Sequence, residues 1–421
     1  MQEAVDKPFL PDIRVDNEIK TMKKILIMCG PDPQSNPRPN RMIRWLEDKY
    51  EVMVVGRNKV EFAKVDSIGI STLGQGSFFR RIARRLPESA IRILKTPIKI
   101  VRMARGQYED IVWANLSRVR GLKDELSKKG FDLIITHDLA FMPLACSIQS
   151  DTTKIMLDAR EYYPRNFDDR WLWRLLTKPV NEYLCKEYLH RCDKIITVSE
   201  GLAQEYAREY HVQPEVIMSL PAFRDLAPIP TNGKTIRIIH HGNLNISRRP
   251  ELMIEMMDYV DERFSLDLML VVGTGGYWNK IVSMVSRRKN VRIIPPVPMD
   301  QIVTFTNQYD IGLFLCPPTN FNLTYTLPNK FFEFIQARLA VAIGPSVEMK
   351  KIVEKYGCGI VSKDFTPQSL AQELNSLTAE RIMQLKERSH RAALELNAEA
   401  NGRRVKEIVR ELITEQRQEA G

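Results

Sequence analysis

The sequence contains no long hydrophobic run, and its cysteines and acidic residues are not spaced for disulfides or metal sites. No stretch reaches the roughly 18 uncharged apolar residues of a membrane-spanning helix, and the first 21 residues are polar and acidic, unlike a secretory signal. The six cysteines are scattered without a CxxC pair, which favours buried reduced thiols over disulfides or zinc ligands. A DxD-type cluster is also missing, and we interpret the isolated pair Asp168 and Asp169 as a helix cap. No metal site is therefore expected.

The bulk composition is that of a soluble globular protein large enough for two domains. Of its 421 residues 44% are apolar and 27% are charged, and single cores rarely grow beyond about 250–300 residues. The net charge of +10 is uneven, because nine Lys or Arg against one Glu lie between Ser77 and Gln107. Most of the excess charge belongs to that segment.

Short β-branched and aliphatic runs alternate with helical patterns along the chain. They lack clean in-out alternation, which is typical of strands buried on both faces of a parallel sheet. Repeated βα units predict an α/β fold with doubly wound parallel sheets. The strand candidates are 23–29, 50–56, 132–138, 154–161 and 194–200 in the first half, and 235–242, 267–273, 291–297, 311–317, 339–345 and 358–361 in the second.

A proline-rich stretch with an Asn-Gly pair, "LPAFRDLAPIPTNGK", predicts a linker between two such domains. The expected ranges are a polar tail at 1–21, a first Rossmann-like domain at 22–222, a linker at 223–234, a second Rossmann-like domain at 235–378 and helices at 379–421. One arrangement that the sequence allows has the helices at 379–421 packed back on the first domain. Ligands of such sheets bind at the carboxyl ends of the strands, so a cleft between the domains is expected.

Three stretches of the second half end a strand in a turn suited to a ligand. In "HHGNLNISRRPE", Gly242 is followed by Arg248 and Arg249 before a helix, which suits either a phosphate or a solvated arginine pair. In "VVGTGGYW", Gly273 begins a turn without GxGxxG spacing, which argues against a NAD site. In "IIPPVPMDQI", prolines on both sides of Val297 hold the chain extended, either for a nucleobase or as a plain loop.

The fourth stretch, "YTLPNKFFEF", begins a helix with a lysine and carries one acid a turn later. Pro328 suits a helix start, and the unpaired first-turn amides carry about half a positive charge. Lys330 adds a full charge, and Glu333 is placed to accept hydrogen bonds from two vicinal hydroxyls. The alternative is an exposed i,i+3 pair, but the phenylalanines around the pair indicate burial, and a buried acid needs partners.

In their order, these stretches resemble the donor half of glycosyltransferase family 4, whose members have the GT-B fold. "LPNKFFEFIQARLAVAIGPSVEMKKIVEKYGCGIV" is similar to that family's helix and following strand, and "DLIITHDLAFMPLA", "LDAREYYP" and "CDKIITVSEGLA" are similar to its cleft-lining strands. The resemblance implies that Glu333 binds the ribose, that Arg248 and Lys330 bind the diphosphate, and that Val297 meets the base through its backbone. The nucleotide-binding set is completed by Gly242, Asn243, Arg249, Gly273, Thr326, Leu327 and Asn329.

Three positions depart from the family pattern. Tyr325 stands where a second acid is usual, so the donor-sugar contact must come from elsewhere, such as the backbone at Thr326. Asn243 stands where many members carry Arg, and Arg160 where many carry His. We assign Arg160 with Glu161 and Arg38 to the acceptor side. His137, at the end of a strand, is either a residue that touches the reacting sugars or a structural histidine.

The resemblance implies a glycosyltransferase that moves a sugar from a UDP- or GDP-type donor to a saccharide or lipid-linked acceptor, retaining its configuration and using no metal or cofactor. A cell-surface polysaccharide or glycolipid is the expected product. The basic segment 77–107 suits an anionic membrane surface as well as a solvated helix face, and too few aromatics accompany it for nucleic acid. We expect a cytoplasmic protein, with the inner membrane face as one place of action. A degenerate nucleotide- or partner-binding subunit and a UDP-sugar epimerase remain alternatives.

Overall fold

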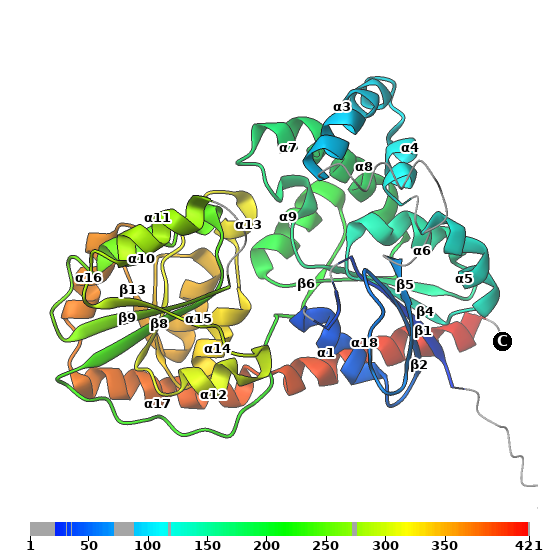
Figure 1. Cartoon of the computed structure of the whole chain (residues 1–421). Helices are drawn as coiled ribbons and strands as arrows, with labels where there is room; N and C mark the ends of the chain where they lie inside the picture. Colours follow the sequence, from blue (N-terminus) through cyan, green and yellow to red (C-terminus); the bar gives the residue numbers. More distant parts are fainter. Residues whose placement is uncertain are drawn as a thin grey trace, which may run out of the picture.

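The computed structural model describes residues 22–30, 32–34, 36–70, 88–116, 119–271 and 276–419. They form two α/β units, each built on a parallel sheet with helices on both faces (Figure 1). Every run that the sequence analysis identified as a strand is a strand. The expected doubly wound α/β fold is therefore confirmed.

The first sheet has the order β3-β2-β1-β4-β5-β6-β7, and all its pairs are parallel. Its central strands are buried on both faces, which explains why they show no alternation. Strands β3 and β7 were not expected from the sequence, because β3 is half exposed and β7 has two residues. The strands are β1 Lys24–Met28, β2 Glu51–Gly56, β3 Val65–Gly69, β4 Leu133–Thr136, β5 Lys154–Ala159, β6 Lys194–Thr197 and β7 Glu215–Val216.

The described helices of the first unit pack around this sheet. They are α1 Pro37–Leu46, α3 Glu88–Ala104, α4 Tyr108–Asn115, α5 Lys123–Lys129, α6 Met142–Ile148, α7 Trp171–Leu176, α8 Lys178–Tyr188 and α9 Glu200–Tyr210. In Figure 1, α3, α7 and α8 lie at the end of the unit far from the C-terminal helix.

The second sheet has the order β10-β9-β8-β11-β12-β13, again with parallel pairs. Its strands are β8 Ile236–Asn243, β9 Phe264–Val271, β10 Val291–Ile294, β11 Ile311–Phe314, β12 Ala340–Ile343 and β13 Gly359–Val361. Its helices are α10 Glu251–Met256, α11 Gly276–Val285, α12 Ile302–Thr306, α13 Phe321–Thr324, α14 Asn329–Gln336, α15 Val347–Tyr356 and α16 Pro367–Asn375.

Two C-terminal helices, α17 (Ala379–Glu395) and α18 (Ala398–Glu419), connect the second unit back to the first. Ala392 and Ala393 of α17 belong to the second unit's core, whereas Val405 and Ile408 of α18 share a core with Ile25 of β1. The two helices therefore run along both units (Figure 1). Apolar burial of this kind stabilises a contact by about 25 cal/mol per Å².

None of the described helices combines the length and the apolar character needed to cross a membrane. The six cysteines carry free thiols, and four of them are buried. Burial raises the pKa of the Cys29 thiol to about 12, so this cysteine is a small apolar core residue and not a nucleophile.

Candidate functional site

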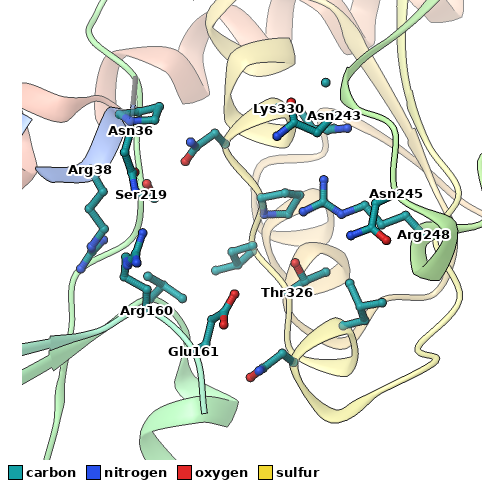
Figure 2. Close-up of a pocket in the computed structure, with 18 of the residues that line it drawn as sticks. Asn36, Arg38, Arg160, Glu161, Ser219, Asn243, Asn245, Arg248, Thr326 and Lys330 are labelled. Atoms are coloured by element: carbon teal, nitrogen blue, oxygen red, sulfur yellow. The ribbon is translucent and has the colours of Figure 1, made fainter. Parts of the chain in front are cut away.

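A cavity of about 840 Å³ lies between the two units, lined by residues that follow strands of both sheets. Figure 2 shows Arg38, Arg160 and Glu161 on the first unit's side, opposite Arg248 and Lys330 on the second unit's side. Ligands of open α/β sheets bind at strand carboxyl ends. The cavity is thus the candidate functional site.

Lys330 is a buried cation in the first turn of α14, and its ammonium lies against the end of β8. The residue is 5% exposed, with Nζ 3.3 Å from His240 Nε2. A Cβ on Gly242, whose φ is +124°, would lie 2.6 Å from Lys330 Nζ, so only glycine leaves room for the ammonium there. Burial, with a further effect of Arg248, lowers the pKa of Lys330 to about 7. An anion in the cavity would offset this cost.

Arg248 ends a short 3₁₀ turn, Ile246–Arg248, that follows β8. The turn is fixed by Asn245, whose Oδ1 accepts a hydrogen bond of 2.9 Å from the Ser247 amide. Arg248 lines the cavity and has no ion pair within the described part of the chain. Its guanidinium is therefore available for a bidentate contact with an anion.

Glu333 lies one turn into α14, at the edge of the same cavity. Burial raises its pKa to about 7, against the opposing effects of Lys330 and of Arg41 from α1. His241 Nε2 lies 3.5 Å from the carboxylate, and burial lowers the pKa of His241 to about 3, so this imidazole is neutral. The helix begins at Asn329, because Pro328 is the extended N-cap and not the first helical residue. The carboxylate, whose side chain is 13% exposed, is thus a largely buried acceptor near two cations.

On the opposite wall, two arginines are held by carboxylates. Arg38 Nε donates to Asp158 Oδ2 at 2.6 Å and Nη1 donates to the Ile217 carbonyl at 2.6 Å. Arg160 Nη2 donates to Asp138 Oδ1 at 3.1 Å. Beside them, Glu161 is exposed within the cavity. This wall therefore presents fixed hydrogen-bonding groups of both charges.

His137 is not among the residues that line the cavity, so its contact with the reacting sugars stays a prediction. The ring is fully buried at the end of β4, with Nδ1 2.8 Å from Asp158 Oδ2 on the neighbouring β5. Arg38 and His137 hold the pKa of this buried carboxyl below its ordinary value, although burial alone would raise it. His137 thus supports the pair of Asp158 and Arg38.

One further predicted residue, Arg249, does not line the cavity in the described structure. Arg249 is exposed, with φ at +49°, and ends the turn that places Arg248. Its side chain is not among those that line the cavity. Gly273 lies outside the described residues.

The remaining predicted residues all line the cavity, together with several residues that were not predicted from the sequence. The predicted lining residues not yet mentioned are Asn243, Val297, Thr326, Leu327 and Asn329. Those missed include Asn36, Ser219, His241 and Asn245. Asn36 was detectable, since it precedes Pro37 at a helix start. Ser219 lies in an irregular segment with no sequence signal.

Tyr325, in the position of the missing acid, packs against the first unit. A Cβ on Gly201 of α9 would lie 1.9 Å from Tyr325 Cδ1, so the ring lies directly on the glycine. Nearby, Asn322 Oδ1 accepts a 2.8 Å hydrogen bond from the Tyr162 amide, and the rings of Phe321 and Tyr162 are 5.1 Å apart. The segment around α13 thus joins the two units at one end of the cavity.

The chemistry that this site offers is binding of a multiply charged anion next to a polyol. No group of three or more His, Cys, Asp or Glu suited to a metal occurs in the part of the chain that the structure describes. Positive charge in the cavity comes from Arg248, Lys330 and the start of α14.

Residues 42–227 match the model of the family described as Glycosyltransferase Family 4. Among solved structures, a sucrose-phosphate synthase from Thermosynechococcus elongatus matches with a TM-score of 0.71 at 12% identity, over 93% of this chain and 99% of that one. An alpha,alpha-trehalose-phosphate synthase (UDP-forming) from Burkholderia vietnamiensis matches with a TM-score of 0.63 at 11% identity, over 93% of this chain and 100% of that one. WaaG, a glycosyltransferase involved in lipopolysaccharide biosynthesis, matches with a TM-score of 0.60 at 12% identity, over 90% of this chain and 98% of that one. A comparison with curated proteins gave no match. At these identities the structural likeness concerns the fold, which is GT-B as expected.

Proposed function

We propose that this chain, a glycosyltransferase of the GT-B fold whose residues 42–227 carry the Glycosyltransferase Family 4 pattern, moves a sugar from a UDP- or GDP-type donor to a saccharide or lipid-linked acceptor. One observation carries the donor class. Arg248 and the buried Lys330 lie on the same side of the cavity, beside the first turn of α14, and neither has an ion pair among the described residues.

The proposed reaction breaks the bond between the anomeric carbon and the diphosphate oxygen. The bond forms between that carbon and an acceptor hydroxyl oxygen, whose proton passes to the leaving diphosphate. Negative charge grows on the diphosphate as the sugar becomes oxocarbenium-like. Arg248, Lys330 and the α14 amides stabilise this charge without a metal, and fixed donors of this kind contribute about 10²–10³-fold each to the rate.

The remaining contacts orient the two substrates. Glu333 accepts hydrogen bonds from the ribose hydroxyls, and the backbone at Val297 meets the base. Arg160, Glu161 and Arg38 face the acceptor. The configuration of the sugar is retained, and no side chain is assigned as a nucleophile.

The charge of one segment supports the proposed acceptor and place of action. The basic segment 77–107 suits an anionic lipid surface, which fits a lipid-linked acceptor in polysaccharide or glycolipid synthesis at the inner face of the cell membrane.

A screen of nucleotide sugars for slow consumption by the purified protein tests this proposal. We expect one UDP- or GDP-sugar to be consumed with release of the diphosphate, and the anomer first formed, observed by NMR, to match the donor. Release of the opposite anomer would contradict retention.

A nucleotide- or partner-binding subunit is the second candidate, since Tyr325 packs on Gly201 and cannot act as the usual acid. Tight binding of UDP or GDP with no donor consumed, with or without candidate acceptors, would favour that function instead.

A further inference from the structure

The short helix α7 carries three large apolar side chains that the described structure leaves about half exposed. Its sequence is WLWRLL, and none of its residues is buried. Trp171 is 64% exposed, Leu172 49% and Leu175 54%. Leu175 lies four residues after Trp171 and three after Leu172, which places the three side chains on one side of the helix, while Trp173 packs against Phe167, with ring centroids 6.2 Å apart. An exposed tryptophan and two leucines on one helical turn are costly in water unless something binds them.

The last turns of α3 expose a second apolar group. Ile98 is 59% exposed, Ile100 46% and Val101 49%, whereas Met103 of the same helix packs on the first unit's core. We call these three residues with Trp171, Leu172 and Leu175 the α3–α7 face. Helices α3 and α7 are joined through α4 and α8, since α3 packs on α4, α4 on α8 and α8 on α7. Figure 1 shows them at one end of the first unit.

Cations stand next to these apolar residues in both helices. Arg170 and Arg174 flank the apolar residues of α7, and Lys99, Arg102 and Arg105 flank those of α3. A helix face that combines aromatic and aliphatic side chains with flanking Lys and Arg suits the interface of an anionic bilayer, because the apolar groups enter the headgroup boundary and the cations meet the lipid phosphates. Long cationic side chains remain in the headgroup region in such an arrangement.

The α7 part of this face begins close to the cavity. Asn166 and Phe167 line the cavity, and the chain enters α7 four residues after Phe167, with Arg170 Cζ 4.9 Å from the Phe167 ring centroid. A molecule held at a membrane by α7 would therefore have its cavity mouth close to the lipid headgroups.

We propose that the α3–α7 face docks on an anionic lipid bilayer, with Trp171, Leu172 and Leu175 inserted at the headgroup boundary, and that the acceptor enters the cavity from that surface. Entry of the acceptor from the bilayer rests on the proposed function. Docking of the α3–α7 face concerns the surface alone, and it extends the membrane contact beyond the basic segment to α7.

Sedimentation with vesicles tests the docking. We expect the full chain to bind vesicles of phosphatidylcholine mixed with phosphatidylglycerol, to bind phosphatidylcholine alone much more weakly, and to be released by high salt. The triple variant Trp171→Ser, Leu172→Ser, Leu175→Ser should lose at least about tenfold in vesicle partitioning. The matched control Ile229→Ser, Val282→Ser, Leu394→Ser changes apolar residues that are also exposed, at 42%, 39% and 57%, but lie elsewhere, and should bind as the wild type does.

Equal binding by the wild type and the α7 triple variant would overturn the proposal, as would failure of the wild type to bind either vesicle. A wild-type oligomer that the α7 variant dissociates, measured by light scattering, would assign the face to a protein interface and also overturn it. Consumption of nucleotide sugar in lipid-free buffer is recorded in parallel. Vesicle binding without donor consumption would contradict the proposed function and leave the docking intact.

Discussion

At the scale of single residues, the site is defined by two buried groups of opposite charge on α14. Burial lowers the pKa of Lys330 and raises that of Glu333, each to about 7. In the ligand-free protein both groups therefore titrate close to neutrality, which is unusual for either residue type. A bound nucleotide sugar is expected to restore the charged form of both.

Affinity for a nucleotide sugar should consequently peak near pH 7. A diphosphate raises the pKa of Lys330, so the contribution of its ammonium is complete below about pH 7 and is lost as the pH rises. Ribose hydroxyls favour the carboxylate and lower the pKa of Glu333, so its contribution is complete above about pH 7 and is lost as the pH falls. Calorimetric titration between about pH 5.5 and 8.5 measures the loss of affinity on each side of this maximum. The variant Glu333→Gln should abolish only the loss of affinity at low pH. An affinity that stays constant across this range would contradict the assignment of both groups.

The sequence predicted Lys330 and Glu333 because the chemistry of a helix start is local. A proline, a lysine and a first-turn position are sufficient to place Lys330 at an anion site. The surroundings of His137 were not predictable, because the direction of a side chain at a strand end depends on the neighbouring strand. Strand register pairs Thr136 of β4 with Leu157 of β5, which brings Asp158 beside His137. No pattern in the sequence gives that register, so this carboxylate could not be inferred as the partner of the histidine.

At the scale of elements, the strands were predictable and the contacts between the units were not. Buried parallel strands are continuous apolar runs, so β1, β4 and β8 are evident from the sequence. The two missed strands lie at the edges of the first sheet. The docking of α13 on the first unit has no sequence signal, because it depends on how two separate sheets face each other.

The contact between Tyr325 and Gly201 predicts a non-additive pair of substitutions. Gly201→Ala should destabilise the protein by about 1–3 kcal/mol, since its methyl group would overlap the Tyr325 ring. In a Tyr325→Ala background the same change should cost little, because the space is then free. Thermal denaturation of the four proteins measures the coupling. Gly121→Ala is the control, as nothing lies within 4 Å of a Cβ there, and additive effects of the pair would contradict the contact.

The buried link between α1, β4 and β5 predicts a large loss of stability for Asp158→Asn. The carboxylate is fully buried and serves both Arg38, at 2.6 Å, and His137, at 2.8 Å. Removing its charge leaves a buried arginine without a counter-ion, which typically costs about 3–5 kcal/mol. Asp48→Asn, which removes an exposed pair with Lys64, should leave the denaturation midpoint unchanged. A midpoint for Asp158→Asn as high as that of the control would disprove this assignment.

At the scale of the whole molecule, the cleft exists because two similar units are held face to face. The α17 and α18 helices connect them along one side, and the α13 segment joins them beside the cavity. The proposed donor groups are on one wall and the proposed acceptor groups on the other (Figure 2). Transfer between two substrates therefore needs both units, although each sheet has its own core.

The central claim is that cationic groups of the second unit bind a diphosphate, and adjacent arginines test it most directly. Arg248 lines the cavity, whereas Arg249 is exposed outside it. Calorimetric titration with UDP and with GDP should show wild-type affinity for Arg249→Ala and a loss of about 10–100-fold for Arg248→Ala, as expected for a charge-assisted hydrogen bond. Unchanged affinity in Arg248→Ala, equal losses in both variants, or no binding of either nucleotide by the wild type would contradict the account.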